Sequence, residues 1–238
     1  MKSNPILNTS KKNQIKKMFD SISNEYDYLN GIITFGNHSK WKKEIAEIAK
    51  LKTPKKILDV ATGTADIAIN LSSIKNCRIY GIDISERMIK IAKQKAEREN
   101  IYNNIFLEIG DAENLKFSNN FFDILTIGFG IRNFIDLDKG LKESYRVLKK
   151  SGYIIILETS LPKNNFIKVF YLIFSRVFIP IIGKLFSNNP KAYKYLQESA
   201  EKFYSVKNVV KKLSHIGFRK IETRSKLFGA STIYVAKK

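Results

Sequence analysis

The chain has 238 residues, long enough to bury a substantial hydrophobic core, and no shift in composition divides it into two independent domains. Its single cysteine, Cys77, excludes an internal disulfide, and because no hydrophobic signal segment opens the sequence we expect a protein of the reducing cytoplasm. The formal net charge of +20 raises a nucleic-acid-binding alternative, but only 8 of the 42 basic residues are Arg and they form no cluster with aromatic residues, so we expect no specific nucleic acid.

The N-terminal part of the chain is predicted to form a helical flap. Residues 1–17 are polar and Lys-rich, which is typical of an arm or a first helix with a solvated face. Residues 19–38 mix aromatic and turn residues without a clean period, which predicts an irregular segment that closes over a site or packs without a chemical role. A helix is expected next, because its apolar residues recur at helical spacing: Trp41, Ile45 and Ile48.

A strand, a small-residue loop and a helix follow at 56–71. Parallel strands deliver ligands to the crevice at their carboxyl ends, and a turn built around Gly63 and Thr64 lets backbone N–H groups approach a polar ligand. The second strand, 77–83, ends in Asp83, where doubly wound folds place a carboxylate that binds ribose hydroxyls. The two strand ends together predict a nucleotide-like ligand.

Two further strand ends carry candidate binding residues. Strand 105–109 leads into Asp111 and Ala112, whose carboxylate and N–H suit the edge of a purine; the alternative is a helix or turn cap. Strand 122–127 leads into the loop 128–133, in which Gly128 and Gly130 allow close backbone approach and Arg132 and Asn133 present polar donors to a substrate oxygen.

The rest of the chain contains a helix over 136–148 that Gly152 is expected to end, and a fifth strand over 153–157. The segment 166–186 is very apolar but contains charges, Pro and Gly, which predicts a buried lid or an interfacial helix pair rather than a spanning helix. A last helix, capped by Ser205 and ended by Gly217, precedes two strand-like runs that predict an antiparallel pair.

The regular alternation of strands and helices predicts an α/β fold, a doubly wound, mostly parallel, seven-stranded Rossmann-like sheet with an antiparallel final hairpin and a helical lid insertion. We expect a single domain over 1–238. Its predicted parts are the N-terminal flap 1–52, the cofactor-binding core 53–160, the apolar lid or substrate segment 161–204, and the final helix and strand pair 205–238.

Several runs resemble the class I methyltransferases that use S-adenosylmethionine, and more closely the quinone-biosynthesis branch that methylates demethylmenaquinol or a polyprenyl benzoquinol. The resemblance covers roughly residues 15–238. Its most specific runs are Tyr26-Asp27-Tyr28-Leu29-Asn30 with His38 and Trp41, Phe129-Gly130-Ile131-Arg132-Asn133, Arg146-Val147-Leu148-Lys149-Lys150-Ser151-Gly152, and Tyr193-Lys194-Tyr195-Leu196-Gln197-Glu198-Ser199. The sequence departs from the usual pattern at Ala61 and Ala65, where more glycine is common, and at Lys150-Ser151, which replaces a Pro-Gly pair.

The resemblance implies a set of cofactor contacts. Gly63 and Thr64 would contact the methionine end of S-adenosylmethionine, Asp83 the ribose, and Asp111 with Ala112 the adenine. Gly128 would let the backbone approach the same ligand. Neither histidine lies near a cysteine or in an HExxH pattern, so we expect no metal site.

The resemblance also implies methylation of a ring carbon, with demethylmenaquinol to menaquinol as the main hypothesis. Arg132 would stabilise a phenolate or orient a water that takes the proton, with Asn133, His38 and Tyr26 as its partners. The apolar segment would line a tunnel for the lipid tail or contact the inner face of the membrane peripherally, and a homodimer is a further expectation. The alternatives are benzoquinol methylation for ubiquinone biosynthesis, an RNA methyltransferase, and a non-catalytic binding protein on the same scaffold.

Overall fold

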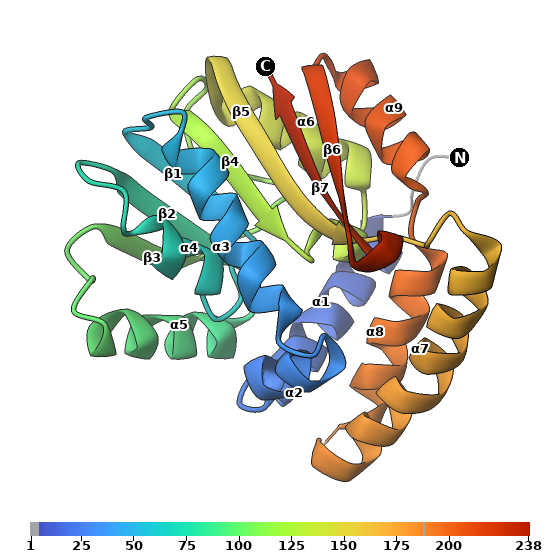
Figure 1. Ribbon diagram of the computed structural model, residues 1–238. Helices are drawn as coiled ribbons and strands as arrows, with labels where there is room; N and C mark the ends of the chain where they lie inside the picture. The colour runs from blue at the N-terminus through green and yellow to red at the C-terminus, as the bar shows by residue number, and fades with distance from the viewer. Residues whose placement is uncertain (1–4, 188) are drawn as a thin grey trace.

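The computed structural model describes residues 5–187 and 189–238 of the chain (Figure 1). The strands are β1 (Lys56–Val60), β2 (Arg78–Asp83), β3 (Ile105–Ile109), β4 (Phe122–Gly128), β5 (Leu148–Thr159), β6 (Arg219–Lys226) and β7 (Ser231–Lys237). The α-helices are α1 (Pro5–Ile22), α2 (Tyr26–Ile33), α3 (Asn37–Lys50), α4 (Asp66–Leu71), α5 (Glu86–Arg98), α6 (Leu137–Val147), α7 (Asn165–Phe186), α8 (Pro190–Lys202) and α9 (Val206–Ile216). Two short 3-10 helices are η1 (Ile131–Asn133) and η2 (Leu227–Gly229).

The strands form one seven-stranded sheet in the order β3-β2-β1-β4-β5-β7-β6. Strands β1 to β5 pair in parallel, whereas β7 is antiparallel to both β5 and β6. The predicted fold class, including the antiparallel final pair, is therefore confirmed. The direction of the strand order reverses between β1 and β4, and in open α/β sheets this reversal opens a crevice at the carboxyl ends of the strands.

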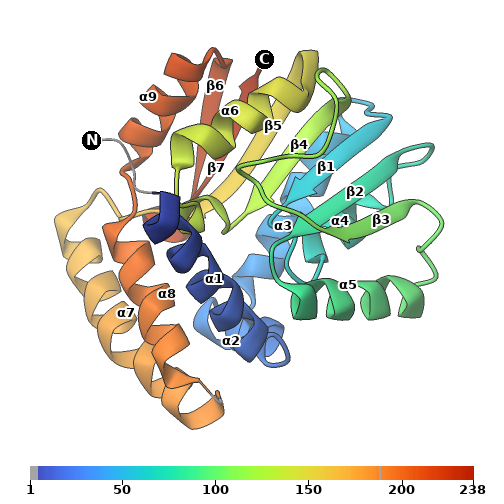
Figure 2. The same cartoon turned by 180° about the vertical axis from the view of Figure 1, so that it is seen from behind.

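Helices cover both faces of the sheet (Figures 1 and 2). Successive side chains of a strand point to opposite faces, so Ile57 and Leu58 belong to different core clusters, although both are fully buried. One cluster joins the sheet to α3, α4 and α5, and the other joins it to α6 and α9. Burial on both faces explains why the central strands are continuous apolar runs rather than alternating ones.

The predicted helix-end signals are correct at Ser205 and Gly217 and wrong at Gly152. The Ser85 side chain accepts a hydrogen bond from the Met88 N–H at 3.1 Å, and Ser205 caps α9 in the same way, with Gly217 following that helix at φ +120°. The prediction that Gly152 ends a helix is wrong. That residue lies inside β5, where an added Cβ would come 2.9 Å from the Asp123 carbonyl oxygen, so glycine is required by close backbone approach.

The prediction of an irregular segment over 19–38 is also wrong, because this region is the end of α1, all of α2 and the start of α3. Only short helical stretches fall within this segment, and they pack against one another and against α7 and α8. Ile22 and Leu29 are fully buried in a third cluster, against Tyr193 of α8 rather than against the sheet. Each helix turns a different narrow face inward, so no single period spans the segment.

The apolar segment is one continuous helix, α7, rather than a buried lid. Its most apolar 18-residue window has a mean hydropathy of 1.9, and only 11% of that window is buried. By length and composition alone, α7 is the one helix among the described residues that would suffice to cross a membrane. It packs against α8 at Gly183, where an added Cβ would lie 2.5 Å from the Tyr193 Cβ. Its opposite side is exposed (Figure 1).

Candidate functional site

Two cavities meet at the carboxyl ends of the strands. The first, the strand-end pocket, holds about 710 Å³ of empty space and is lined by the ends of β2, β3 and β4 together with α1. The second, the apolar pocket, holds about 1670 Å³ and lies between α2, α3, α7 and η2. Both volumes include the open mouths. Five residues line both cavities: Tyr26, Ala61, Gly63, Gly128 and Phe129.

All ten predicted site residues line one or both of these cavities. Asp83, Asp111, Ala112 and Asn133 line the strand-end pocket, and Thr64, His38 and Arg132 line the apolar pocket. Tyr26, Gly63 and Gly128 lie at the boundary. The topology thus gathers residues that are spread over more than a hundred positions, while the role of each remains a prediction.

Asp83 is held rigidly at the end of β2. Its two carboxylate oxygens accept hydrogen bonds from the Gly63 N–H at 2.9 Å and from the Ser85 N–H at 2.8 Å. Burial raises the pKa of Asp83 to about 6, against the opposing effect of these hydrogen bonds. Each carboxylate oxygen has a second lone pair, so the side chain can still accept hydrogen bonds from a ligand in the pocket.

The loop after β1 owes its shape to a left-handed backbone. Gly63 has φ +57°, and a Cβ added there would meet no atom within 4 Å, so the space above it belongs to the cavities. Ala61 and Ala65, at the positions where the sequence departs from the glycine pattern, have φ +53° and +67°. A left-handed conformation costs an L-residue about 1–2 kcal/mol, so the two alanines adopt a backbone that glycine would adopt without strain.

Asp111 has a partner that the sequence did not reveal. The Lys12 ammonium of α1 lies 2.8 Å from the Asp111 carboxylate and 3.3 Å from that of Glu113. Residues 5–17 therefore belong to helix α1 rather than to an arm, residues 1–4 lie outside the described residues, and Lys12 points into the strand-end pocket instead of lying on a solvated face. No local pattern distinguishes Lys12 from its neighbours Lys11, Lys16 and Lys17, because the contact depends on where α1 packs.

Arg132 lies in the lining of the apolar pocket, with a side chain only 7% exposed. Its Nη1 donates to the Glu158 carboxylate at 2.7 Å and to the Phe129 carbonyl oxygen at 2.8 Å. Glu158, at the end of β5, is fully buried. The Arg132 Nε is buried and has no hydrogen-bond partner within the described part of the chain. A buried donor without a partner is costly, and it suits a site that a ligand oxygen completes.

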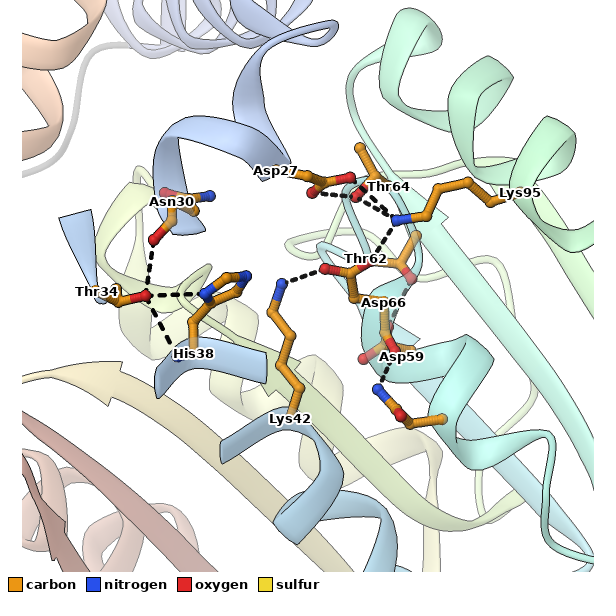
Figure 3. Close-up of polar contacts among 11 residues, drawn as sticks. Asp27, Asn30, Thr34, His38, Lys42, Asp59, Thr62, Thr64, Asp66 and Lys95 are labelled. Atoms are coloured by element: carbon orange, nitrogen blue, oxygen red, sulfur yellow. Dashed lines mark hydrogen bonds and ion pairs between the residues drawn. The ribbon is translucent and has the colours of Figure 1, made fainter. Parts of the chain in front are cut away.

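His38 projects from α3 toward Thr34 and Asn30 (Figure 3). The Thr34 hydroxyl oxygen is 2.8 Å from the His38 Nδ1 and 2.7 Å from the Asn30 carbonyl oxygen. Burial, and then the nearby Lys42 ammonium, lowers the pKa of His38 below its usual value. Asp66 and Asp27 act in the opposite direction, and Lys95 adds to the lowering. The imidazole is therefore neutral at pH 7.

A chain of charges ties α2 to α3, α4 and α5 (Figure 3). Lys42 pairs with Asp66 at 2.7 Å, and Lys95 pairs with both Asp66 and, at 3.0 Å, Asp27. Asp27 also accepts a hydrogen bond from the Thr64 hydroxyl at 2.7 Å. The two lysines hold the pKa of Asp66 at about 2, despite its burial. This network was not predicted, since its members come from four helices that only the fold brings together.

Other features of the chain do not suggest metal or thiol chemistry. Burial raises the pKa of the Cys77 thiol to about 11, as expected for an inert core residue. Residues 5–187 and 189–238 contain no group of three or more His, Cys, Asp or Glu side chains placed to hold a metal ion.

The architecture defines a class I methyltransferase fold, and the comparisons agree. A putative S-adenosyl-L-methionine-dependent methyltransferase from Methanococcus maripaludis superimposes with a TM-score of 0.63, at 19% identity, over 94% of this chain and 93% of that chain. At this identity, the similarity establishes the fold alone.

Sequence comparison is more specific. The model of the ubiE/COQ5 methyltransferase family matches residues 7–238. A relative from Bacteroides fragilis, named demethylmenaquinone methyltransferase, is 38% identical over 236 residues, covering 98% of this chain and 96% of the relative. A relative from Geotalea daltonii, named ubiquinone/menaquinone biosynthesis C-methyltransferase UbiE, is 36% identical over 232 residues, covering 97% and 98%. The chain belongs to the ubiE/COQ5 methyltransferase family and is an S-adenosylmethionine-dependent methyltransferase.

The strand-end pocket fits this cofactor. It offers the buried Asp83 carboxylate for ribose hydroxyls and an open space above the left-handed Gly63. An apolar wall that includes Ile84 and Met88 suits a planar base. The five boundary residues join this pocket to the apolar pocket.

Proposed function

We propose that the protein methylates a ring carbon of a polyprenyl quinol, with demethylmenaquinol as substrate and menaquinol as product. The proposal is carried by the Arg132 site, in which a buried guanidinium with an unpartnered Nε lines a cavity that is otherwise mostly apolar. An aromatic ring with a hydroxyl group and a long hydrocarbon tail matches that combination. The name of the Bacteroides fragilis relative supports the naphthoquinol as the first choice.

When bound, the cofactor supplies a methyl group that its sulfonium already activates, so the protein must position the acceptor ring and make it electron-rich. Holding two reactants in line can contribute up to about 7–11 kcal/mol of barrier reduction. Deprotonation of the ring hydroxyl supplies the electron density. Arg132 would donate its free N–H to the developing phenolate, with its orientation fixed by Glu158.

His38 would take the hydroxyl proton, directly or through a water. Donation of the Thr34 hydroxyl hydrogen to the Asn30 carbonyl leaves the proton of the imidazole on Nδ1 and a free lone pair on Nε2. The lowered pKa of His38 supports a ring that is neutral and ready to accept a proton. Tyr26, which lines both cavities, would position the ring, whereas Asn133 would act from the strand-end pocket, where its Oδ1 accepts a hydrogen bond from the Tyr195 hydroxyl at 3.2 Å.

The cofactor assignments follow from the resemblance and stay part of the proposal. Gly63 and Thr64 would contact the methionine end and Asp83 the ribose. Asp111 and Ala112 would contact the adenine, with Lys12 closing that end, and Gly128 would allow the close approach. A cytoplasmic protein with peripheral contact at the inner face of the membrane would meet such a lipid substrate. The expected homodimer is a separate part of the proposal, and light scattering of the purified protein checks it.

The decisive experiment supplies purified protein and labelled methyl donor with three acceptors in parallel: demethylmenaquinol, the corresponding demethylated benzoquinol, and RNA. We expect label in the naphthoquinol. Preferential labelling of the benzoquinol would select the ubiquinone alternative, which the name of the Geotalea daltonii relative keeps open. Labelling of RNA with both quinols inert, or cofactor binding without any turnover, would overturn the proposal.

A further inference from the structure

The outer side of α7 is a continuous apolar stripe. Its members recur every three or four residues, so they lie on one side of the helix. Each is between 46% and 73% exposed: Phe166, Val169, Phe170, Ile173, Val177, Phe178, Ile181 and Leu185. Monomeric proteins rarely expose a continuous apolar surface of this extent unless a partner covers it.

The charged residues of the segment that carries the stripe are all basic. From residue 159 to residue 197 the sequence contains six Lys or Arg residues and no Asp or Glu. Lys163 and Lys184 stand exposed near the two ends of α7. An apolar helix face flanked by cations is the pattern of a helix that lies in the headgroup region of an anionic bilayer.

The stripe continues into the mouth of the apolar pocket. Phe35, Phe170 and Phe228 line that pocket and are 74%, 59% and 77% exposed. Phe35 and Phe228 come from distant parts of the chain, yet both have left-handed backbones, with φ +50° and +55°. Such a conformation in a bulky residue costs about 1–3 kcal/mol and is kept where it serves a function. Here it holds two aromatic rings outward at the entrance.

We propose that this surface, the α7 stripe with Phe35 and Phe228, docks on an anionic lipid bilayer so that the apolar pocket opens directly into the membrane. The identity of the lipid that enters the pocket rests on the proposed function, whereas the docking itself does not. The face that must be covered is apolar and its surroundings are basic, so a bilayer with acidic headgroups matches both features at once.

The helix lies in the plane of the bilayer surface and does not span it. The inner side of α7 packs against α8 through the buried Ser175 and Gly183, and Arg176 pairs with Glu201 at 3.0 Å. The exposed residues of α8 include Lys191, Lys194 and Lys202, which would be costly in the hydrocarbon core. A spanning orientation would carry these charges into the membrane, whereas an in-plane orientation leaves them in water.

The test is co-sedimentation of the full chain with two vesicle preparations, phosphatidylcholine alone and phosphatidylcholine with about a third phosphatidylglycerol. We expect binding to the anionic vesicles that weakens as salt is raised. The triple variant Ile173→Glu, Val177→Glu, Ile181→Glu should lose about tenfold or more of this binding, because it places three charges in the contact. None of the three residues lines the apolar pocket.

The matched control is Leu51→Glu, Tyr102→Glu, Phe106→Glu. It makes the same charge change at residues that are 82%, 58% and 44% exposed but lie outside the stripe. Phe106 belongs to β3, the edge strand of the sheet (Figure 1), and Tyr102 lies in the turn before it. The control should bind vesicles within about twofold of the unaltered chain, since its substitutions touch no part of the docking surface. A second variant, Phe166→Glu with Leu185→Glu, removes the two ends of the stripe and should reproduce the loss.

Absence of vesicle binding by the unaltered chain, or equal binding by the triple variant and the control, would overturn the proposal. Equal binding to neutral and anionic vesicles would overturn the choice of an anionic surface. Unchanged affinity of the variants for S-adenosylmethionine verifies that they are folded. Vesicle binding without methylation of any quinol would support the docking and overturn the proposed function. Quinol methylation without vesicle binding would support the proposed function and overturn the docking.

Discussion

The two cavities of the site are built in different ways. The strand-end pocket is formed by segments that directly follow β1, β2, β3 and β4, and its hydrogen bonds involve backbone N–H groups such as those of Gly63 and Ser85. The apolar pocket is formed by side chains of α2, α3, α7 and η2. A cavity made from strand ends is fixed by the sheet, whereas one made from packed helices depends on how those helices sit. The first therefore suits a constant cofactor and the second a substrate specific to this family.

If each cavity serves one ligand, a change in one should leave the affinity for the other ligand intact. Arg132→Lys gives the largest expected effect. Lysine keeps a charge opposite Glu158 but loses the planar fork and the free Nε, so kcat with the quinol should fall about 10²-fold. The dissociation constant of S-adenosylmethionine, measured by calorimetry, should stay within about threefold, because Arg132 does not line the strand-end pocket.

Arg146→Lys is the control for that variant. Arg146 holds the loop 115–119 through its bonds to the Leu115 and Phe117 carbonyl oxygens at 2.8 Å, away from both cavities. It should lower thermal stability and leave kcat near its original value. A kcat for Arg132→Lys within threefold of the unaltered enzyme would contradict the assigned role.

Asp83→Asn should act on the other cavity. The amide would present an NH₂ group to one of the two backbone N–H donors and would remove the charge, so affinity for S-adenosylmethionine should fall about 10- to 100-fold. The matched change is Asp123→Asn at the amino end of β4, where the carboxylate also accepts two backbone N–H bonds, from Lys55 and Lys56. Equal losses of affinity in the two variants would show that Asp83 acts only through stability.

The same carboxylate predicts a pH dependence. Burial raises the pKa of Asp83 to about 6, so the acceptor form is lost below that pH and the dissociation constant of S-adenosylmethionine should rise about fivefold from pH 6 to pH 5. The folding stability of the protein without ligand depends on pH in the opposite direction. The folded pKa lies above the unfolded value, so the stability from protonated Asp83 is present below about pH 4 and is lost as pH rises through 6. Calorimetry across this range, with Asp83→Asn as reference, checks both.

The smallest expected effect tests the strain in the loop after β1. Ala61→Gly removes a left-handed penalty of about 1–2 kcal/mol and adds an entropic cost of about 0.5–1 kcal/mol, which leaves a gain of about 0.5 kcal/mol. The melting temperature should rise by about 1–2 °C. Asn76→Gly, at φ +57°, is the comparison and should gain less, because asparagine tolerates this conformation. A fall in melting temperature for Ala61→Gly would mean that the Ala61 methyl group contributes more through packing.

The difference between the cavities also explains what the sequence revealed. Asp83, Asp111 and Arg132 could be found because each lies at, or within four residues after, the end of a recognisable strand, and the carboxyl ends of parallel strands meet at one edge. Lys12, Lys42 and Lys95 could not, because their importance comes from helix packing and the chain has many lysines in similar contexts. The helices over 19–38 were missed for the same reason, since their buried faces contact one another as well as the core.

The anchoring of α2 has a kinetic consequence. Tyr26 borders both cavities, and Asp27 binds Thr64 and Lys95, so one short helix forms a common roof over the two cavities. Lifting this roof to exchange one ligand exposes the other cavity as well. If α2 moves to exchange either ligand, departure of the methylated product and replacement of the spent methyl donor would be linked events in each turnover, and the Asp27–Lys95 ion pair would resist that movement.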